Sequence, residues 1–122
     1  MTNPERKRMH SPHQPTGTWI RRERRLAIYL RDRLRCVYCA ADLHGASPAD
    51  LTLDHLDCRQ DGGANHETNL VTACRSCNSR RADRPWAEFA DARATHRIER
   101  RWESLEKYLI LARDLIARRQ EA

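Results

Sequence analysis

The chain has 122 residues and a formal net charge of +6, with 39% hydrophobic and 33% charged residues. This length corresponds to one domain, and so polar a composition leaves a thin apolar core, of the kind that metal or oligomerisation often reinforces. The longest apolar runs have five residues, whereas a membrane span needs about 20, so we expect no transmembrane helix. No apolar run follows the charged N-terminus, so we expect no secretory signal and a cytoplasmic location.

Positive charge is concentrated at the beginning of the chain. Residues 1–35 hold ten basic and three acidic residues, whereas residues 36–58 hold four acidic residues and no basic one. A basic segment beside a small acidic island suggests a polyanion partner and a cation site in one molecule. A solvated helix face is the alternative explanation of the basic segment.

The first third combines an arm and a helix. Residues 1–17 contain three prolines and almost no apolar side chain, and we interpret them as a mobile basic arm. From residue 18 to residue 34, apolar side chains recur mostly at three- and four-residue spacing, which predicts an amphipathic helix with arginines on its other face. We expect Arg21, Arg22 and Arg25 on that face to contact nucleic-acid phosphates.

Short strands are predicted in the middle of the chain. Residues 35–38 are expected to form one, and residues 51–56 alternate with a period of two, which predicts a second. Residues 70–72 are a third candidate, followed by a helix from 74 to about 82. Pro85 is expected to begin another helix as its first residue.

The last third is expected to be helical. Apolar side chains follow an alternating four- and three-residue spacing at Ile98, Trp102, Leu105, Leu109, Ala112 and Ile116. This stripe either packs on the body of the same chain or forms a self-association face and hence a homodimer. We therefore divide the chain into the arm, a body at 18–84 and a helical extension at 85–122.

Four of the five cysteines form two Cys-x-x-Cys pairs, Cys36–Cys39 and Cys74–Cys77. A two-residue gap lets both thiolates of a tight turn face one ion, and two such turns complete a tetrahedral zinc site. A redox role is the weaker alternative, because neither pair opens a helix within a strand-helix-strand pattern. We interpret Cys58 as a reduced, partly packed thiol.

A second cation site is predicted between the two pairs. Asp54 and His55 are neighbours on a predicted strand, so their side chains leave on opposite faces and only one of them can easily bind a given ion. Asn78 follows Cys77 directly and can offer a carbonyl oxygen. Asp54 and Asn78 together suit a hard divalent ion such as magnesium.

In these spaced elements the chain resembles the HNH endonuclease family, whose fold is the ββα-metal motif. The resemblance runs from Arg31 to Arg81. It rests on Leu53-Asp54-His55, Gly62-Gly63, Asn69-Leu70-Val71 and Cys74-Arg75-Ser76-Cys77-Asn78. It implies an α+β fold with a ββα core and a four-cysteine zinc site, flanked by an N-terminal helix and a long C-terminal helical segment. It also implies a bacterial or phage-encoded nuclease that hydrolyses a DNA phosphodiester.

The resemblance assigns roles to individual residues. The residues at the Asp54 and Asn78 positions bind the catalytic Mg²⁺ or Mn²⁺, the histidine at the His55 position is the general base, and the asparagine at the Asn69 position braces the loop that orients it. Asn78 stands in place of histidine, which favours magnesium or manganese over zinc in the catalytic site. Arg80 and Arg81 follow on the same helix and are candidates for phosphate contacts.

Other functions stay open at this point. A zinc-stabilised nucleic-acid-binding module without catalysis would keep the cysteines and arginines but would not need Asp54, His55 and Asn78 together. A zinc-built protein-interaction module is supported only by the C-terminal stripe. The stretch between His55 and the glycine pair lacks the proline that many family members have. We interpret the remaining histidines as surface or packing residues: His10, His13, His44, His66 and His96.

Overall fold

The computed structural model describes residues 21–57, 66–101 and 105–121. In chain order the elements are α2 (Arg22–Arg31), a 3-10 turn (Pro48–Asp50), β1 (Leu51–His55), a second 3-10 turn (Glu67–Asn69), β2 (Leu70–Cys74), α3 (Arg75–Arg81), α4 (Trp86–Phe89), α5 (Ala92–Arg100) and α6 (Glu106–Glu121). The fold is therefore α+β, as predicted. The predicted arm, Cys58, the glycine pair and Trp102 lie outside the described residues.

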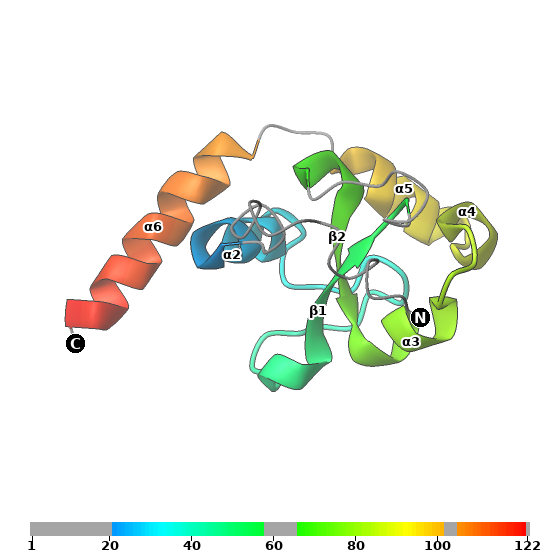
Figure 1. Cartoon of the computed structure of the whole chain (residues 1–122), viewed down its shortest axis with the longest axis horizontal. Coiled ribbons are helices and arrows are strands. Elements are labelled where there is room, and N and C mark those ends of the chain that lie inside the picture. Colours follow the sequence, from blue (N-terminus) through cyan, green and yellow to red (C-terminus); the bar gives the residue numbers. More distant parts are fainter. Residues whose placement is uncertain (1–20, 58–65, 102–104, 122) are drawn as a thin grey trace, which may run out of the picture.

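A ββα unit lies at the centre of the molecule (Figure 1). β1 and β2 form a two-stranded antiparallel sheet in which Leu51 lies opposite Cys74 and His55 lies opposite Leu70. α3 follows β2 directly, because Cys74 ends the strand and also caps the helix. Its Sγ accepts a hydrogen bond from the Cys77 amide at 3.4 Å.

The strand predicted at residues 35–38 is replaced by a tight turn. Arg35 makes only an isolated bridge with Asp42. Residues 37–39 form a turn, which the Ala40 amide closes by donating to the Cys36 carbonyl at 2.8 Å, and Ala40 follows it with a left-handed φ of 65°. The turn still docks on the sheet, because the Val37 amide donates to the Thr72 carbonyl at 3.0 Å. The prediction of a strand was wrong because this segment must bend to bring two thiols together.

Two helix boundaries differ from those predicted. α2 ends at Arg31, before the predicted residue 34, because Arg33 and Leu34 adopt left-handed backbone angles with φ of 62° and 52°. Pro85 precedes α4 as its N-cap and is not its first helical residue.

One apolar cluster joins the cysteine turns to the sheet and to α5. Its buried members include Cys36, Cys77, Val71 and, from α5, Ala94 and Ile98. α5 begins at a side-chain cap, since Asp91 accepts a hydrogen bond from the Ala94 amide at 2.8 Å. The beginning of the C-terminal extension therefore packs on the same core as the cysteine turns.

A second apolar cluster joins α2 to α6. Its buried members are Ala27, Ile28, Leu70, Leu105 and Ala112. The predicted apolar stripe is thus divided, with Ile98 in the first cluster and Leu105 in the second. The division follows from the break between α5 and α6, which lets the two halves of the stripe face different partners.

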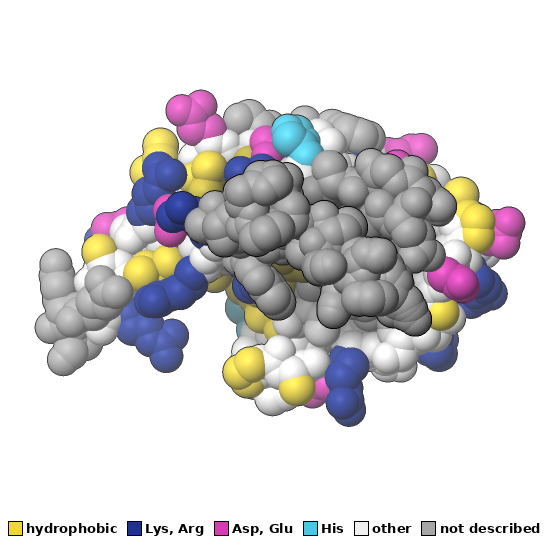
Figure 2. Space-filling view, viewed as in Figure 1, with side chains coloured by type: hydrophobic (Ala, Val, Ile, Leu, Met, Phe, Trp, Pro, Cys, Tyr) yellow, Lys and Arg dark blue, Asp and Glu magenta, His cyan; other side chains and the backbone are white. Residues whose placement is uncertain are grey.

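α6 lies beside α2 and continues beyond it, away from the sheet (Figure 1). Ile110, Leu111 and Leu115 remain 62%, 43% and 41% exposed, and hydrophobic and basic side chains are interspersed along this end of the molecule (Figure 2). Within the described residues, no helix has the length and apolar character needed to cross a membrane.

Candidate functional site

The two cysteine turns bring four sulfur atoms together. The Sγ atoms of Cys36, Cys39, Cys74 and Cys77 all lie within 4.8 Å of one another, and the Sγ atoms of Cys39 and Cys74 are 3.9 Å apart. With Zn–S bonds of about 2.3 Å, a tetrahedral site requires S–S separations of about 3.8 Å. The four thiols therefore fit a zinc ion in number, chemistry and spacing.

Hydrogen-bond donors surround these sulfurs. The Cys39 amide donates to Cys36 Sγ at 3.5 Å, and the Arg80 guanidinium donates to Cys77 Sγ at 3.3 Å. Burial raises the pKa of Cys36, and burial together with the Cys36 charge raises the pKa of Cys77. The N–H donors around these sulfurs would stabilise the thiolates that a bound cation requires.

Asp54 is a buried carboxylate with two strong donors. Its carboxylate accepts from the Tyr38 hydroxyl at 2.5 Å and from Nη1 of Arg81 at 2.8 Å and 3.0 Å. Burial and the negative charge of Asp54 raise the pKa of Tyr38, so that hydroxyl remains a donor. Asp54 is 6% exposed, which makes the paired arginine necessary to offset its desolvation.

Arg81 was predicted to contact phosphate, but the structure places it in the interior, 4% exposed. Besides Asp54, its guanidinium donates to the carbonyls of His55 at 2.6 Å, Leu56 at 2.7 Å and Arg84 at 2.8 Å. These bonds occupy the guanidinium, so we correct its role to one of holding Asp54 and the end of β1. The reason is that a buried acid on β1 needs a buried cation nearby, and α3 supplies it.

A pocket of about 260 Å³ collects the residues that the sequence singled out. Its lining includes Asp54, His55, Asn78 and also Asp83. Asn78 comes from α3, and its amide nitrogen donates to Thr52 Oγ1 at 3.0 Å, which fixes the orientation of the side chain. We expected Asp54 and His55 on opposite faces of the strand, and both nevertheless line this one pocket, where β1 ends.

The oxygen donors of this pocket fit a divalent ion in kind. A carboxylate has about four lone-pair positions, and Tyr38 and Arg81 do not use all of those on Asp54. The nearby Arg81 charge nevertheless opposes a second cation at the same carboxylate. Any ion bound here shares Asp54 with Arg81.

Asn69 holds the chain that follows His55. Its Oδ1 accepts from the Asp57 amide at 2.8 Å, its Nδ2 donates to the Asp57 carbonyl at 3.2 Å, and its own carbonyl accepts from the Leu56 amide at 2.8 Å. Asn69 thus clamps the backbone one and two residues beyond His55.

The remaining predicted residues lie at the surface. His66 caps the 3-10 turn at Glu67–Asn69, since its side chain accepts from the Thr68 amide at 3.2 Å. His44 pairs with Asp42 at 2.6 Å on an exposed turn, and the His44 amide and ring lower the pKa of Asp42. His96 is exposed.

Of the predicted phosphate contacts, Arg21, Arg22 and Arg80 are exposed, and Arg25 is half-buried with Nη1 donating to the Tyr29 hydroxyl at 3.2 Å.

Sequence reasoning missed Tyr38 and Asp83. Tyr38 lies between the first two cysteines, where the turn carries it toward β1, 16 positions away. The sequence did offer one signal: Asp54 lies on a strand that was expected to be half-buried, and a buried carboxylate needs buried hydrogen-bonding partners. Nothing in the local sequence identified which residues those partners are.

Comparison with known proteins gives one match. Residues 36–84 match the family model described as HNH endonuclease. The matched segment begins at the first cysteine of the first pair and contains both strands, α3 and all four zinc-site cysteines. Comparisons with curated proteins and with solved structures gave no significant match.

Proposed function

The chain carries an HNH endonuclease domain at residues 36–84, and on this premise we propose that it is a metal-dependent endonuclease that hydrolyses DNA phosphodiester bonds. One observation carries the proposal. Asp54, His55 and Asn78, which lie up to 24 positions apart in the chain, line the same pocket. A module that only bound nucleic acid would need no such grouping.

In this proposal Asp54 and Asn78 hold the catalytic Mg²⁺ or Mn²⁺. When bound, the ion supplies positive charge that offsets the negative charge growing on the phosphate in the transition state. Tyr38 and Arg81 hold the Asp54 carboxylate in one orientation through their hydrogen bonds to it. A zinc ion held by the four cysteines would be structural, since it would join the turn that carries Tyr38 to the beginning of α3, which carries Asn78.

His55 is the general base in this proposal. It takes a proton from the attacking water, a contribution of roughly 10²–10⁴-fold to the rate. Asn69 supports this role through its bonds to the backbone of Leu56 and Asp57, because a base must be held within hydrogen-bond reach of the proton that it takes. We further propose that the arm at 1–17 and the exposed arginines Arg21, Arg22 and Arg80 add non-specific phosphate contacts.

One observation favours a non-catalytic nucleic-acid-binding module instead. Arg81 already neutralises Asp54, which weakens the attraction of that carboxylate for a divalent ion. In such a module the Asp54–Arg81 pair would serve only the fold, and the arginines would bind nucleic acid without cleavage.

Nicking of supercoiled plasmid in the presence of Mg²⁺ or Mn²⁺ separates the two functions. We expect the wild type to nick and both Asp54→Ala and His55→Ala to lose activity. Calorimetry should show weaker divalent-ion binding for Asp54→Ala only, while His55→Ala keeps its zinc, its fold and its divalent ion. His66→Ala is the matched control, and it should nick like the wild type.

Two outcomes would contradict this mechanism. If His55→Ala kept a tenth of the wild-type rate or more, another group would be the base. If His55→Ala lost the divalent ion, His55 would be a ligand. A wild type that binds DNA but never nicks it would favour the binding module.

A further inference from the structure

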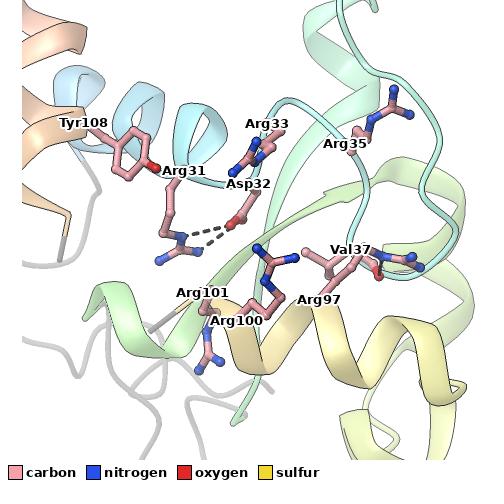
Figure 3. A pocket seen from close by; sticks show the side chains of 9 residues that line it. All are labelled: Arg31, Asp32, Arg33, Arg35, Val37, Arg97, Arg100, Arg101 and Tyr108. Carbon is pink, nitrogen blue, oxygen red and sulfur yellow. Dashed lines mark hydrogen bonds and ion pairs between the residues drawn. The ribbon is translucent and has the colours of Figure 1, made fainter. Parts of the chain in front are cut away.

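A larger basic pocket lies outside the candidate catalytic site. It has a volume of about 320 Å³ and lies between the end of α2, the following turn, α5 and the beginning of α6 (Figure 3). Six arginines line it: Arg31, Arg33, Arg35, Arg97, Arg100 and Arg101. Asp32 is the one carboxylate among its lining residues.

The Asp32 carboxylate already has hydrogen-bonding partners within the protein. Asp32 pairs with Arg31 at 2.8 Å, and the side chains are 3% and 2% exposed. The other carboxylate oxygen also accepts from the Thr72 amide at 2.8 Å, which ties the end of α2 to β2. Asp32 thus neutralises Arg31 and leaves the positive charge of the other five arginines.

Two further lining arginines donate hydrogen bonds to neutral backbone carbonyls and not to carboxylates. Arg97 donates to the carbonyls of Val37 at 2.8 Å and Tyr38 at 3.2 Å. Arg101 is 6% exposed and donates to the carbonyls of Ile98 and Thr68. Burial and the charge of Arg31 lower the pKa of Arg101 to about 10. An anion entering the pocket would relieve that repulsion.

The three remaining lining arginines, Arg33, Arg35 and Arg100, are exposed. Arg33 occupies the left-handed position just beyond α2, with a φ of 62°. There its amide donates to the Leu30 carbonyl at 2.9 Å and the Leu34 amide donates to the Tyr29 carbonyl at 2.8 Å. Glycine is favoured at this position of a helix end, and a larger residue costs about 1 kcal/mol. An arginine occupies this position in spite of that cost, and its side chain is exposed and lines the pocket.

We propose that this pocket binds a backbone phosphate of the DNA, away from the bond that is cut. This inference rests on the proposed function. Guanidinium groups offer paired N–H donors that match phosphate oxygens. A pocket lined by both buried and exposed arginines suits a ligand that continues beyond the pocket. The pocket is joined to the candidate site, because Arg97 holds the carbonyl of Tyr38, whose hydroxyl donates to Asp54.

Duplex-DNA binding by the Arg33→Gln/Arg100→Gln double variant tests the proposal. Both side chains are exposed, so the fold should persist, and zinc content and the melting temperature check this. Fluorescence anisotropy of a labelled duplex over a salt series, without added divalent ion, should show at least about tenfold weaker binding than the wild type. The salt slope of log affinity should fall by about 0.9, the value for a single phosphate on duplex DNA.

The matched control is Arg113→Gln/Arg119→Gln, which removes two exposed charges from α6 outside the pocket. Its salt slope should differ from that of the wild type by less than half as much as the slope of the pocket variant does. An equal fall in both variants would mean that only net charge matters, and it would overturn the proposal. Arg100→Gln alone should give part of the effect and guards against a misfolded double variant.

Three results separate failure of this inference from failure of the proposed function. If the wild type nicks plasmid and the pocket variant binds duplex with the wild-type affinity and slope, the inference is wrong and the nuclease stands. If the wild type neither binds nor nicks DNA, both fail. If inorganic phosphate raises the melting temperature of the wild type but not of the pocket variant, while duplex affinity is the same in both, the pocket takes a free anion and the DNA assignment is overturned.

Discussion

Nη1 of Arg81 donates to both carboxylate oxygens of Asp54, at 3.0 Å and 2.8 Å. The side chains are 4% and 8% exposed, so this is an interior ion pair that joins α3 to β1. Its position decides two properties at once. It holds the end of β1 against α3, and it limits the charge that Asp54 can offer to a divalent ion.

Arg81→Ala should destabilise the protein by about 3–5 kcal/mol, because it leaves the Asp54 carboxylate buried without its cation. Urea unfolding followed by circular dichroism measures this change. Arg75→Ala, on the same helix, is the control. Its Nε is 3.7 Å from Asp50 and its side chain is 70% exposed, so its removal should change stability by no more than about 0.5 kcal/mol. Similar destabilisation of the two variants would show that the buried pair has no special role.

One zinc ion per chain should survive purification, and metal analysis measures it. Cys39→Ser should lose the ion and lower the melting temperature, because a structural zinc site contributes directly to folding free energy, by roughly 10–16 kcal/mol in finger peptides. A strong chelator should have the same effect on the wild type. Cys58→Ser should keep its zinc, and a Cys58→Ser protein without zinc would show that the ligand set is incorrect.

Asn69→Ala should reduce nicking by about tenfold or more while zinc content and DNA affinity persist, because it removes the two side-chain bonds to the Asp57 backbone. The effect should appear in kcat at saturating DNA, since a displaced base slows chemistry and not binding. His66→Ala, at the cap of the same 3-10 turn, should leave kcat unchanged. A fall confined to DNA affinity in Asn69→Ala would argue against a bracing role.

Leu105→Ala should destabilise the protein by about 2–5 kcal/mol, as large-to-small core substitutions do, because Leu105 is 2% exposed between α2 and α6. Ile110→Ala, at a residue 62% exposed, should change stability by less than about 0.5 kcal/mol in the monomer. Sedimentation at several protein concentrations tests self-association, which the sequence left open as one of two roles for the apolar stripe of this helix. A dimer that Ile110→Ala dissociates would place the exposed side chains in its interface.

The sequence alone predicted the resemblance that the family-model match at residues 36–84 bears out, the α+β fold class and the four cysteines that could hold zinc. These features depend on local spacing. A spacing of two residues between cysteines predicts a turn, and an alternation of apolar and polar residues with a period of two predicts β1. The motif that contains Asp54 and His55 can be identified from the order of its own residues, without knowledge of the rest of the chain. The helical character of the last third followed from the same kind of local periodicity, although the break between α5 and α6 did not.

Contacts between residues far apart in the chain were decided only by the tertiary structure. Arg81 and Asp54 are separated by 27 positions, and Arg97 and Val37 by 60. Which arginine is buried against a carboxylate, and which arginines gather around a pocket, depends on how α3 and α5 pack on the sheet. All arginines have the same side chain, so their sequence positions do not distinguish an interior support from a surface contact. Burial does, because removing a charge from water requires a partner, and only the assembled fold shows whether that partner is present.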